Sequence, residues 1–422
     1  MGGDGRTVVV SYATGWDLSS GTALGPLSGS EAEARDRAGE PYVMVHRVEG
    51  RSAPVEVHLV AWGDHYVGAW AYDDQTRRTR EMDWRLIEPG RLFLRHFEEW
   101  RYGSPTQAEF AEDAWRTSTD LFPDGKGRKV SEPKGRRGSS LHTLADIPET
   151  DRWRDRSTLG VRGVRNLLFP HEALVGRHVT YRDSSGAVGD GAPAAQTPWL
   201  PPRPAEPEHL RELFEPGTRM ATRFEPEMTV DGVRDIAVLR VPSGRLTVAD
   251  PLMTGNTAGR ELTERIPPGA YPVQAAVVAY EGRYEDERFP VEEDVAIRLL
   301  VDAEPPVSWE LALAEGDDAR LLRDREIFGF DTDSAAGCFA DSSGWEVLAH
   351  KYRSYVVDRQ RDAGENVGEG FIRTSDDMTG SDLVSFYTGG DGTYPVWLGR
   401  SESGKLVSVV VECGYLPDLR VL

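Results

Sequence analysis

A stretch rich in proline, glycine and alanine divides this chain of 422 residues into two parts. Residues 184–206 read SSGAVGDGAPAAQTPWLPPRPAE, a composition with too little apolar surface to bury a core. We expect an extended linker there, between an N-terminal domain at 1–183 and a C-terminal domain at 207–422. The segment Pro201–Pro204 could bind an aromatic groove as a polyproline helix, although a plain spacer explains it as well.

The first part of the chain shows strand signals separated by tight turns. In one of them Val55, Val57 and Leu59 alternate with Glu56 and His58, which is the period of a half-buried strand. Gly-Asp and Pro-Gly pairs beside these segments are typical of turns. The sequence therefore predicts a meander of antiparallel strands at residues 41–46, 55–62, 65–72 and 91–97.

A helix is expected after these strands. Ser104 suits the N-cap and Pro105 the first helical position, and a Pro-Asp-Gly turn after Leu121 would end the helix there. This helix gives the N-terminal domain an α+β character. The basic run at 126–138 that follows is interpreted as a solvated loop, or as a loop that receives an acidic partner.

The C-terminal part carries one short motif twice. Gly269–Val273 reads GAYPV and Gly392–Val396 reads GTYPV, and each follows a strand that ends in Ala-Asp, at Asp250 and at Asp341. Glycine and proline fix the turn and the start of the strand in both copies. We expect two related hairpin units around one core.

The fold class predicted for the whole chain is α+β and β-rich, with two domains of mostly antiparallel sheet and a few helices. The long insertion at 342–390 lies in the second copy of the repeated unit. It holds a helix predicted at Trp345–Tyr355 and a polar, glycine-rich segment at 361–380, which we expect to be a mobile loop.

Several short motifs follow one another in the C-terminal part: Ser243–Leu246, Ala249–Pro251, Pro267–Val273, Trp309–Ala312, Phe328–Phe330, Gly337–Asp341 and Gly390–Val396. Their order resembles a bacterial family, the one catalogued as domain of unknown function 4241. The resemblance covers about residues 206–422 and implies no activity. Where the family pattern usually has one acidic residue before a Gly-Cys step, this chain has both Asp331 and Asp333.

The composition restricts the partners that this chain can bind. Its formal net charge is −21, so it repels phosphates, and we expect no nucleic-acid binding. A basic protein or a divalent cation would suit it better. No apolar run is long enough to span a bilayer and no secretory signal is visible, and the two cysteines, Cys338 and Cys413, fit a reducing compartment. We expect a cytoplasmic protein that binds no membrane.

Four aspartates form the best candidate for a chemical site. Asp331 and Asp333 share one face of an extended segment, Asp341 ends the next strand, and Asp391 lies in a Gly-Asp-Gly turn. Oxygen ligands of this kind suit Mg²⁺ or Ca²⁺, and such a metal could activate water for hydrolysis. Aspartates at strand ends and in turns also commonly cap backbone amides, so the alternative is a purely structural role.

Two further residues complete the candidate site. Cys338 lies in an apolar strand, where a buried structural thiol is expected. A nucleophilic role would need a nearby base; the domain offers His209 and His350, and His350 in the neighbouring predicted helix could approach. Tyr394 belongs to the second copy of the repeated motif.

Three functions follow as hypotheses. The first is a non-catalytic interaction protein of an immunity-like kind, which would mask a basic effector by charge complementarity. The second is a metal-dependent hydrolase that uses the four aspartates. The third is a small-ligand-binding β domain.

Overall fold

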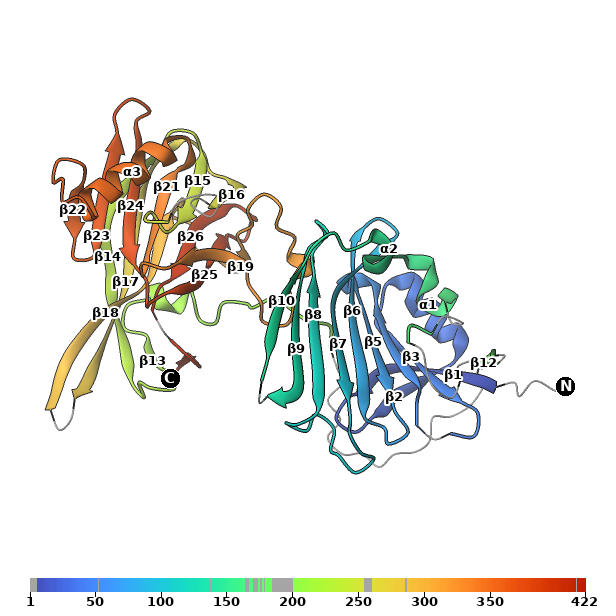
Figure 1. The fold of residues 1–422 in the computed structure, drawn as a ribbon. Helices are drawn as coiled ribbons and strands as arrows, with labels where there is room; N and C mark the ends of the chain where they lie inside the picture. The colour runs from blue at the N-terminus through green and yellow to red at the C-terminus, as the bar shows by residue number, and fades with distance from the viewer. Residues whose placement is uncertain are drawn as a thin grey trace. The chain divides into compact units, whose positions relative to one another are not determined.

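The computed structural model describes residues 6–51, 53–136, 138–163, 167–169, 174, 177, 179–183, 200–253, 260–284, 287–414 and 416–422. The chain divides into two compact units, Met1–Pro202 (unit 1) and Arg203–Leu422 (unit 2) (Figure 1). Residues 184–199 of the expected linker lie outside the described residues. Its last residues are held by unit 2, because Arg203 and Ala205 form backbone hydrogen bonds with Arg325 and Glu326.

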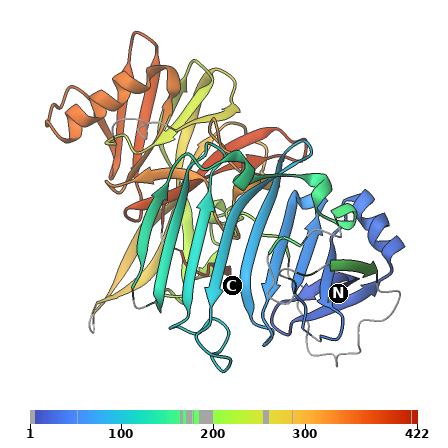
Figure 2. The same ribbon diagram turned by 45° about the vertical axis from the view of Figure 1, so that its right-hand side comes forward.

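Unit 1 is a meander that forms one large sheet. In its described part the strands follow the order β10-β9-β8-β7-β6-β5-β4-β3-β1-β12, with β11 beside β7 and β2 beside β1 (Figure 2). Neighbouring strands are antiparallel except for β1 and β12, which are parallel. The strands are β1 (Arg6–Asp17), β2 (Thr22–Leu27), β3 (Tyr42–Val48), β4 (Glu56–Ala61), β5 (Tyr66–Tyr72), β6 (Arg78–Glu88), β7 (Arg91–Arg101), β8 (Trp115–Leu121), β9 (Gly127–Arg136), β10 (Ser140–Leu144), β11 (Trp153–Asp155) and β12 (Val179–Asp183).

The four strands predicted in this unit are confirmed as β3, β4, β5 and β7. Trp16 and Trp70 are fully buried on one face of the sheet, in a cluster with side chains of β3 and β4. On the other face, helix α1 (Gly29–Ala38) is tied to the sheet by Asp36, which accepts hydrogen bonds from Tyr42 Oη at 2.6 Å and Trp62 Nε1 at 2.7 Å.

The helix predicted from Ser104 to Leu121 is wrong, because residues 115–121 form strand β8. Thr117 and Thr119 are buried while Arg116, Ser118 and Asp120 alternate with them, and this period of two suits a ladder between β7 and β9. The helix-start signals at Ser104 and Pro105 contribute little free energy, and pairing with the strands on either side contributes more. The basic run at 126–138 is likewise mostly strand β9 rather than a loop.

Unit 2 is a sandwich of two antiparallel sheets. The larger sheet has the order β19-β25-β26-β18-β17-β14-β13-β27, with β20 beside β25, and the smaller has the order β16-β15-β21-β24-β23-β22 (Figure 1). Larger-sheet strands are β13 (Arg219–Ala221), β14 (Met228–Val241), β17 (Gly269–Tyr284), β18 (Glu287–Leu300), β19 (Ser308–Leu311), β20 (Gly329–Thr332), β25 (Gly392–Arg400), β26 (Leu406–Glu412) and β27 (Arg420–Val421). Smaller-sheet strands are β15 (Arg245–Ala249), β16 (Arg260–Arg265), β21 (Ala336–Asp341), β22 (Glu365–Gly368), β23 (Phe371–Asp376) and β24 (Ser381–Tyr387).

The core of unit 2 lies between these two sheets. Val273, Leu299 and Val396 of the larger sheet pack in one cluster with Phe339 and Phe386 of the smaller sheet. The outer face of the larger sheet is covered in part by a short turn of 3-10 helix, η4 (Glu212–Phe214). The β-rich, mostly antiparallel fold class is thus confirmed.

The insertion at 342–390 forms one half of the smaller sheet, β22 to β24, and also the helix that covers its outer face. Its predicted helix is confirmed as α3 (Trp345–Val356), which buries Leu348 and Tyr352 against Cys338. The segment expected to be a mobile loop, 361–380, instead contains β22 and β23, because Phe371 and Thr374 are buried and continue the ladder of β24.

A glycine substitution tests the path of residues 102–114 over the sheet of unit 1. Gly135 has a left-handed φ of 62°, and a β-carbon there would overlap the carbonyl of Glu112. We expect Gly135→Ala to lower the free energy of unfolding by about 1–3 kcal/mol, measured by denaturant titration. Gly138→Ala, where an added methyl meets open space, is the matched control. Equal stabilities of the two variants would contradict this packing.

Candidate functional site

The two copies of the repeated motif adopt the same local structure. In the first copy Tyr271 Oη donates to the carbonyl of Pro267, and in the second Tyr394 Oη donates to the carbonyl of Gly390 at 3.0 Å. In both, a tyrosine at the start of a strand closes onto the turn four residues earlier. Tyr394 also stacks on Phe330, so its position is explained by packing.

The two Ala-Asp strand ends are also equivalent, and each holds the turn of the other unit. Asp341, at the end of β21, accepts hydrogen bonds from the backbone N–H of Ser243 at 2.9 Å and from its hydroxyl at 2.8 Å. Asp250, directly after β15, accepts from the hydroxyls of Ser334 at 2.7 Å and Thr332 at 2.8 Å. Ser243 lies in the turn before β15 and Ser334 in the turn before β21. We call these contacts the reciprocal Asp–Ser caps.

The second oxygen of each carboxylate caps its own turn in the same way. Asp250 accepts from the N–H of Leu252 and Asp341 from the N–H of Ser343, both at 2.8 Å. Both carboxylates are almost completely buried. The third residue of each turn has a left-handed φ, 68° at Gly244 and 50° at Ala335. The repeat is therefore real at the level of individual hydrogen bonds.

The repeated units are arches rather than the hairpins that we predicted. β14 lies in the larger sheet and β15 in the smaller, and β20 and β21 are divided in the same way. The reason is that the turn residues carry the chain across the core from one sheet to the other. β15 and β21 then pair antiparallel at the centre, with Leu246 opposite Asp341 and Ala249 opposite Cys338.

The structure separates the four predicted metal ligands. Asp331, Asp333 and Asp391 are exposed, and Asp331 accepts a hydrogen bond from Thr393 across the β20–β25 pair. Asp341 lies at the far end of β21, roughly 17 Å along the strand from the turn that holds Asp333. Among the described residues no group of three or more His, Cys, Asp or Glu side chains is arranged to hold a metal ion.

Cys338 lies in an apolar layer between β21 and α3. Its thiol is fully buried beneath α3, and burial raises the pKa of this thiol well above its usual range. His350 is exposed on the same helix. The geometry therefore supports the expected structural thiol.

Unit 1 contains a pocket with paired carboxylates that sequence reasoning missed. Glu81 on β6 lies directly opposite Glu98 on β7, so both side chains point to one face of the sheet. His96 continues the row, with its Nδ1 3.0 Å from a carboxylate oxygen of Asp120 and its Nε2 3.8 Å from one of Glu98. The loop at 102–114 covers this face and encloses a cavity of about 340 Å³, lined by Glu81, Glu98, Trp100, Phe110, Ala111, Glu112, Ala114, Arg116, Glu132 and Gly135.

Burial raises the pKa of Glu81, and the negative charge of Glu98 adds to the rise. Arg116 lines the same cavity, but its guanidinium is occupied by Glu132 at 2.9 Å. A carboxyl with a raised pKa beside a second carboxyl is a common arrangement for proton exchange with a ligand. The alternation of charged residues over 81–85 and 96–98 was visible in the sequence, but only the covering loop makes it a pocket.

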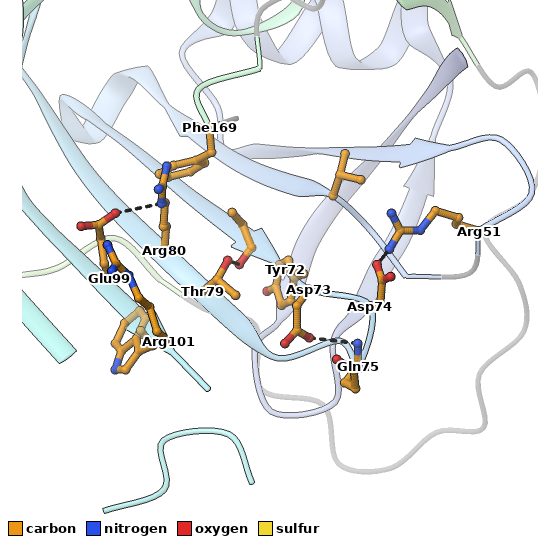
Figure 3. Close-up of a pocket in the computed structure, with 13 residues that line it drawn as sticks. Arg51, Tyr72, Asp73, Asp74, Gln75, Thr79, Arg80, Glu99, Arg101 and Phe169 are labelled. Atoms are coloured by element: carbon orange, nitrogen blue, oxygen red, sulfur yellow. Dashed lines mark hydrogen bonds and ion pairs between the residues drawn. The ribbon is translucent and has the colours of Figure 1, made fainter. Parts of the chain in front are cut away.

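A second, larger cavity of about 650 Å³ lies beside it, and Trp100 lines both (Figure 3). Its lining carries ion pairs, between Arg80 and Glu99 at 3.0 Å and between Arg51 and Asp74. Since these side chains neutralise one another, this cavity presents no net charge to a ligand.

Residues 239–411 match the family described as Protein of unknown function (DUF4241). The resemblance seen in the C-terminal sequence is thereby confirmed. The DUF4241 region begins in β14 and ends in β26, and it includes both arches with their reciprocal Asp–Ser caps. No curated protein and no solved structure matches the chain. Within the described residues, no helix is long and apolar enough to cross a membrane.

The reciprocal Asp–Ser caps can be tested by a double-mutant cycle. Removing Asp341 leaves buried donors of Ser243 without a partner, so we expect Asp341→Ala to cost about 1–3 kcal/mol of unfolding free energy. Ser243→Ala combined with it should add much less than its own effect, since both break the same contact. Asp391→Ala, at an exposed turn, is the control. If Asp341→Ala and Asp391→Ala lower the free energy of unfolding equally, the caps do not hold the arches.

The raised pKa of Glu81 predicts a pH dependence of stability. A carboxyl with a higher pKa in the folded state than in the unfolded state makes folding take up a proton. The contribution of Glu81 to the free energy of unfolding therefore falls as pH rises from the unfolded-state pKa, near 4.5, through the higher folded-state pKa. We expect Glu81→Gln to stabilise the protein at neutral and alkaline pH but not in acid, as measured by denaturant titration at several pH values. Glu88→Gln, at an exposed turn, should follow the wild type throughout; a Glu81→Gln curve parallel to it would refute the assignment.

Proposed function

We propose that unit 2, which contains the DUF4241 region, is a docking module for a basic protein partner. The charge of the chain is concentrated there, with 41 Asp and Glu against 23 Lys and Arg, a net charge of −18. Unit 1 has 29 Asp and Glu against 26 Lys and Arg, a net charge of −3. A charge imbalance confined to one unit favours a role in recognition over a general role in solubility.

The observation that carries this proposal is a two-stranded ribbon at the end of β17 and β18. β17 pairs with β14 only as far as Tyr280, and β18 pairs with β26 only from Ala296. The described ribbon beyond these points, residues 281–284 and 287–294, which we call the acidic arm, has no strand beside it among the described residues (Figure 1). A two-stranded ribbon alone is marginally stable in water, so a third strand would stabilise it.

The side chains of the acidic arm suit a basic strand. Five carboxylates of the arm face two of its own arginines, Arg283 and Arg288. Arg288 pairs with Glu281 at 2.8 Å, and Asp294 pairs with Arg234 of β14 at 2.6 Å, so three carboxylates remain for a partner. Phe289 is 44% exposed and would give the partner an apolar contact. The five carboxylates are Glu281, Glu287, Glu292, Glu293 and Asp294.

The electrostatics of Asp294 point in the same direction. Burial raises the pKa of this carboxyl, Arg234 opposes the rise, and Glu293 and Glu369 add to it. A cation from a partner would relieve this crowding of negative charge. Main-chain pairing to the free edge of β18 would supply affinity, and charge complementarity would supply specificity and a fast association rate. An immunity-like protein that masks a basic effector is a specific form of this function.

A defined peptide tests the acidic arm in the full-length protein. The probe is an alternating Lys-Val peptide, with a Lys-Pro peptide of the same charge as its partner control, and binding is followed by fluorescence anisotropy. We expect the Lys-Val peptide to bind better, and its binding to weaken as ionic strength rises toward about 0.15 M. The variant Glu287→Gln/Glu292→Gln/Glu293→Gln should reduce its affinity about tenfold or more.

The matched control places the same change of charge elsewhere on unit 2. The triple variant Glu346→Gln/Asp358→Asn/Glu402→Gln neutralises three exposed carboxylates away from the arm. If the two triple variants weaken binding equally, the interaction is a general charge effect and the proposal fails. Equal binding of the Lys-Pro peptide would exclude strand pairing.

The carboxylate pocket of unit 1 favours a second candidate function, acid–base chemistry on a small ligand. Glu81 would act as the acid and Glu98 as the base, with Trp100 as an apolar wall. Pairs of this kind hydrolyse glycosidic bonds, so a panel of chromogenic glycosides is the natural assay. Activity should vanish in both Glu81→Gln and Glu98→Gln and persist in Glu88→Gln. No turnover of any glycoside by the wild type, or activity that survives both changes, would count against it.

A further inference from the structure

A groove on the outer face of the larger sheet of unit 2 contains polar groups without partners. Its floor is formed by Arg298 and Leu300 of β18 and by Ser408 of β26, and its volume is about 300 Å³. We call it the Arg298 groove. Its walls are Arg211, Phe214 and Glu215 on one side and Ala303, Glu304, Pro305, Pro306 and Trp309 on the other.

Ser408 is the first of these groups. Its side chain is 3% exposed, and its hydroxyl has no hydrogen-bond partner among the described residues. Gly399 on the neighbouring strand leaves room for it, since a β-carbon there would lie 2.5 Å from Ser408 Oγ and 2.8 Å from Trp309. A buried hydroxyl without a partner is costly, so its retention in a cavity points to a ligand that completes it.

Arg298 is the second group. Its Nε donates to Gln274 at 2.7 Å, and its guanidinium lies 4.4 Å from the ring centre of Phe214. No carboxylate within the described ranges pairs with it, and its two terminal nitrogens have no hydrogen bond there. Burial lowers the pKa of Arg298. The guanidinium remains charged, because arginine does not lose its proton in proteins, and its free nitrogens form a fork that fits an oxyanion.

The walls define the rest of the ligand. Phe214, Trp309 and Pro306 offer flat apolar surfaces to a planar body. The volume is at the lower limit for ligand pockets, which excludes a folded peptide segment. Glu215 and Glu304 at the rim disfavour a doubly charged anion such as phosphate. Glu215 is partly neutralised by Arg211 at 2.9 Å.

We propose that the Arg298 groove binds a small aromatic monocarboxylate. The carboxylate would accept two hydrogen bonds from Arg298 and one from the hydroxyl of Ser408, and the ring would lie between Phe214 and Trp309. This site is independent of the acidic arm, so either proposal can fail alone.

Benzoate is the probe, tested on the full-length protein by calorimetry and thermal unfolding. We expect benzoate to bind and to raise the melting temperature, while neutral benzamide does neither. Acetate, which lacks the ring, and inorganic phosphate should need at least about tenfold higher concentrations. If phosphate or acetate binds as well as benzoate, the walls do not select the ligand and the proposal is overturned.

Two variants separate binding from folding. Arg298→Lys keeps the charge but removes the fork, and we expect it to weaken benzoate binding about tenfold or more. Arg420→Lys, the same substitution at an exposed arginine of β27 outside the groove, should bind as the wild type does.

Ser408→Ala provides a signature that a purely structural serine would not give. Because it removes a buried hydroxyl without a partner, it should raise the melting temperature of the free protein while reducing the shift that benzoate produces. A benzoate shift that is unchanged in both Ser408→Ala and Arg298→Lys would overturn the proposal, whatever the stability of the free proteins.

Discussion

Unit 2 depends on two buried carboxylates that each hold the other's turn. A carboxylate removed from water is costly unless its oxygens accept hydrogen bonds, and Asp250 and Asp341 each accept at least three. The donors come from turns that carry the chain between the two sheets. The register of β15 and β21, the position of both arches and the spacing of the sheets are therefore fixed together. Small hydroxyl residues in the turns are needed because only they reach the carboxylate without filling the core.

This arrangement leaves the chemistry of unit 2 at its periphery. Of the four aspartates that the sequence suggested as metal ligands, Asp341 accepts hydrogen bonds in the reciprocal Asp–Ser caps. The other three are exposed. Among the described residues of unit 2, the groups that lack internal partners include Arg260 Nε, the hydroxyl of Ser408 on the outer face of the larger sheet, and the free edges of the acidic arm.

The sequence predicted those features that depend on local periodicity. Alternation at Val55–Leu59 predicted β4, the repeated Tyr-Pro motif predicted the starts of β17 and β25, and the apolar segment after Gly344 predicted α3. It failed where distant segments decide the outcome. Ser104 and Pro105 resemble a helix start, but the neighbouring strands β7 and β9 draw residues 115–121 into the sheet.

The candidate sites were less accessible from the sequence than the fold, for the same reason. Asp341 was correctly placed at a strand end, but its partner Ser243 lies 98 residues earlier, and no local pattern joins them. Glu81 and Glu98 become a pocket only through the loop at 102–114, and Ser408 comes beside Gly399 and Trp309 only in the folded sheet. Whether a side chain is buried, or pairs with a residue so far away in the sequence, is decided only when the chain folds.

The parallel pairing of β1 with β12 has a consequence for the way unit 1 is made. Residues 12–17 of β1 pair with β2 as soon as both are made, but residues 6–10 gain their outer neighbour only after β12 has been synthesised, with Arg6 opposite Val179. From β3 to β10, strands can add one after another as they leave the ribosome, because each pairs with the one before it. The outer edge of β1 at residues 6–10 therefore stays open until β12 is made, and the nascent chain needs protection from other unpaired strands at that edge.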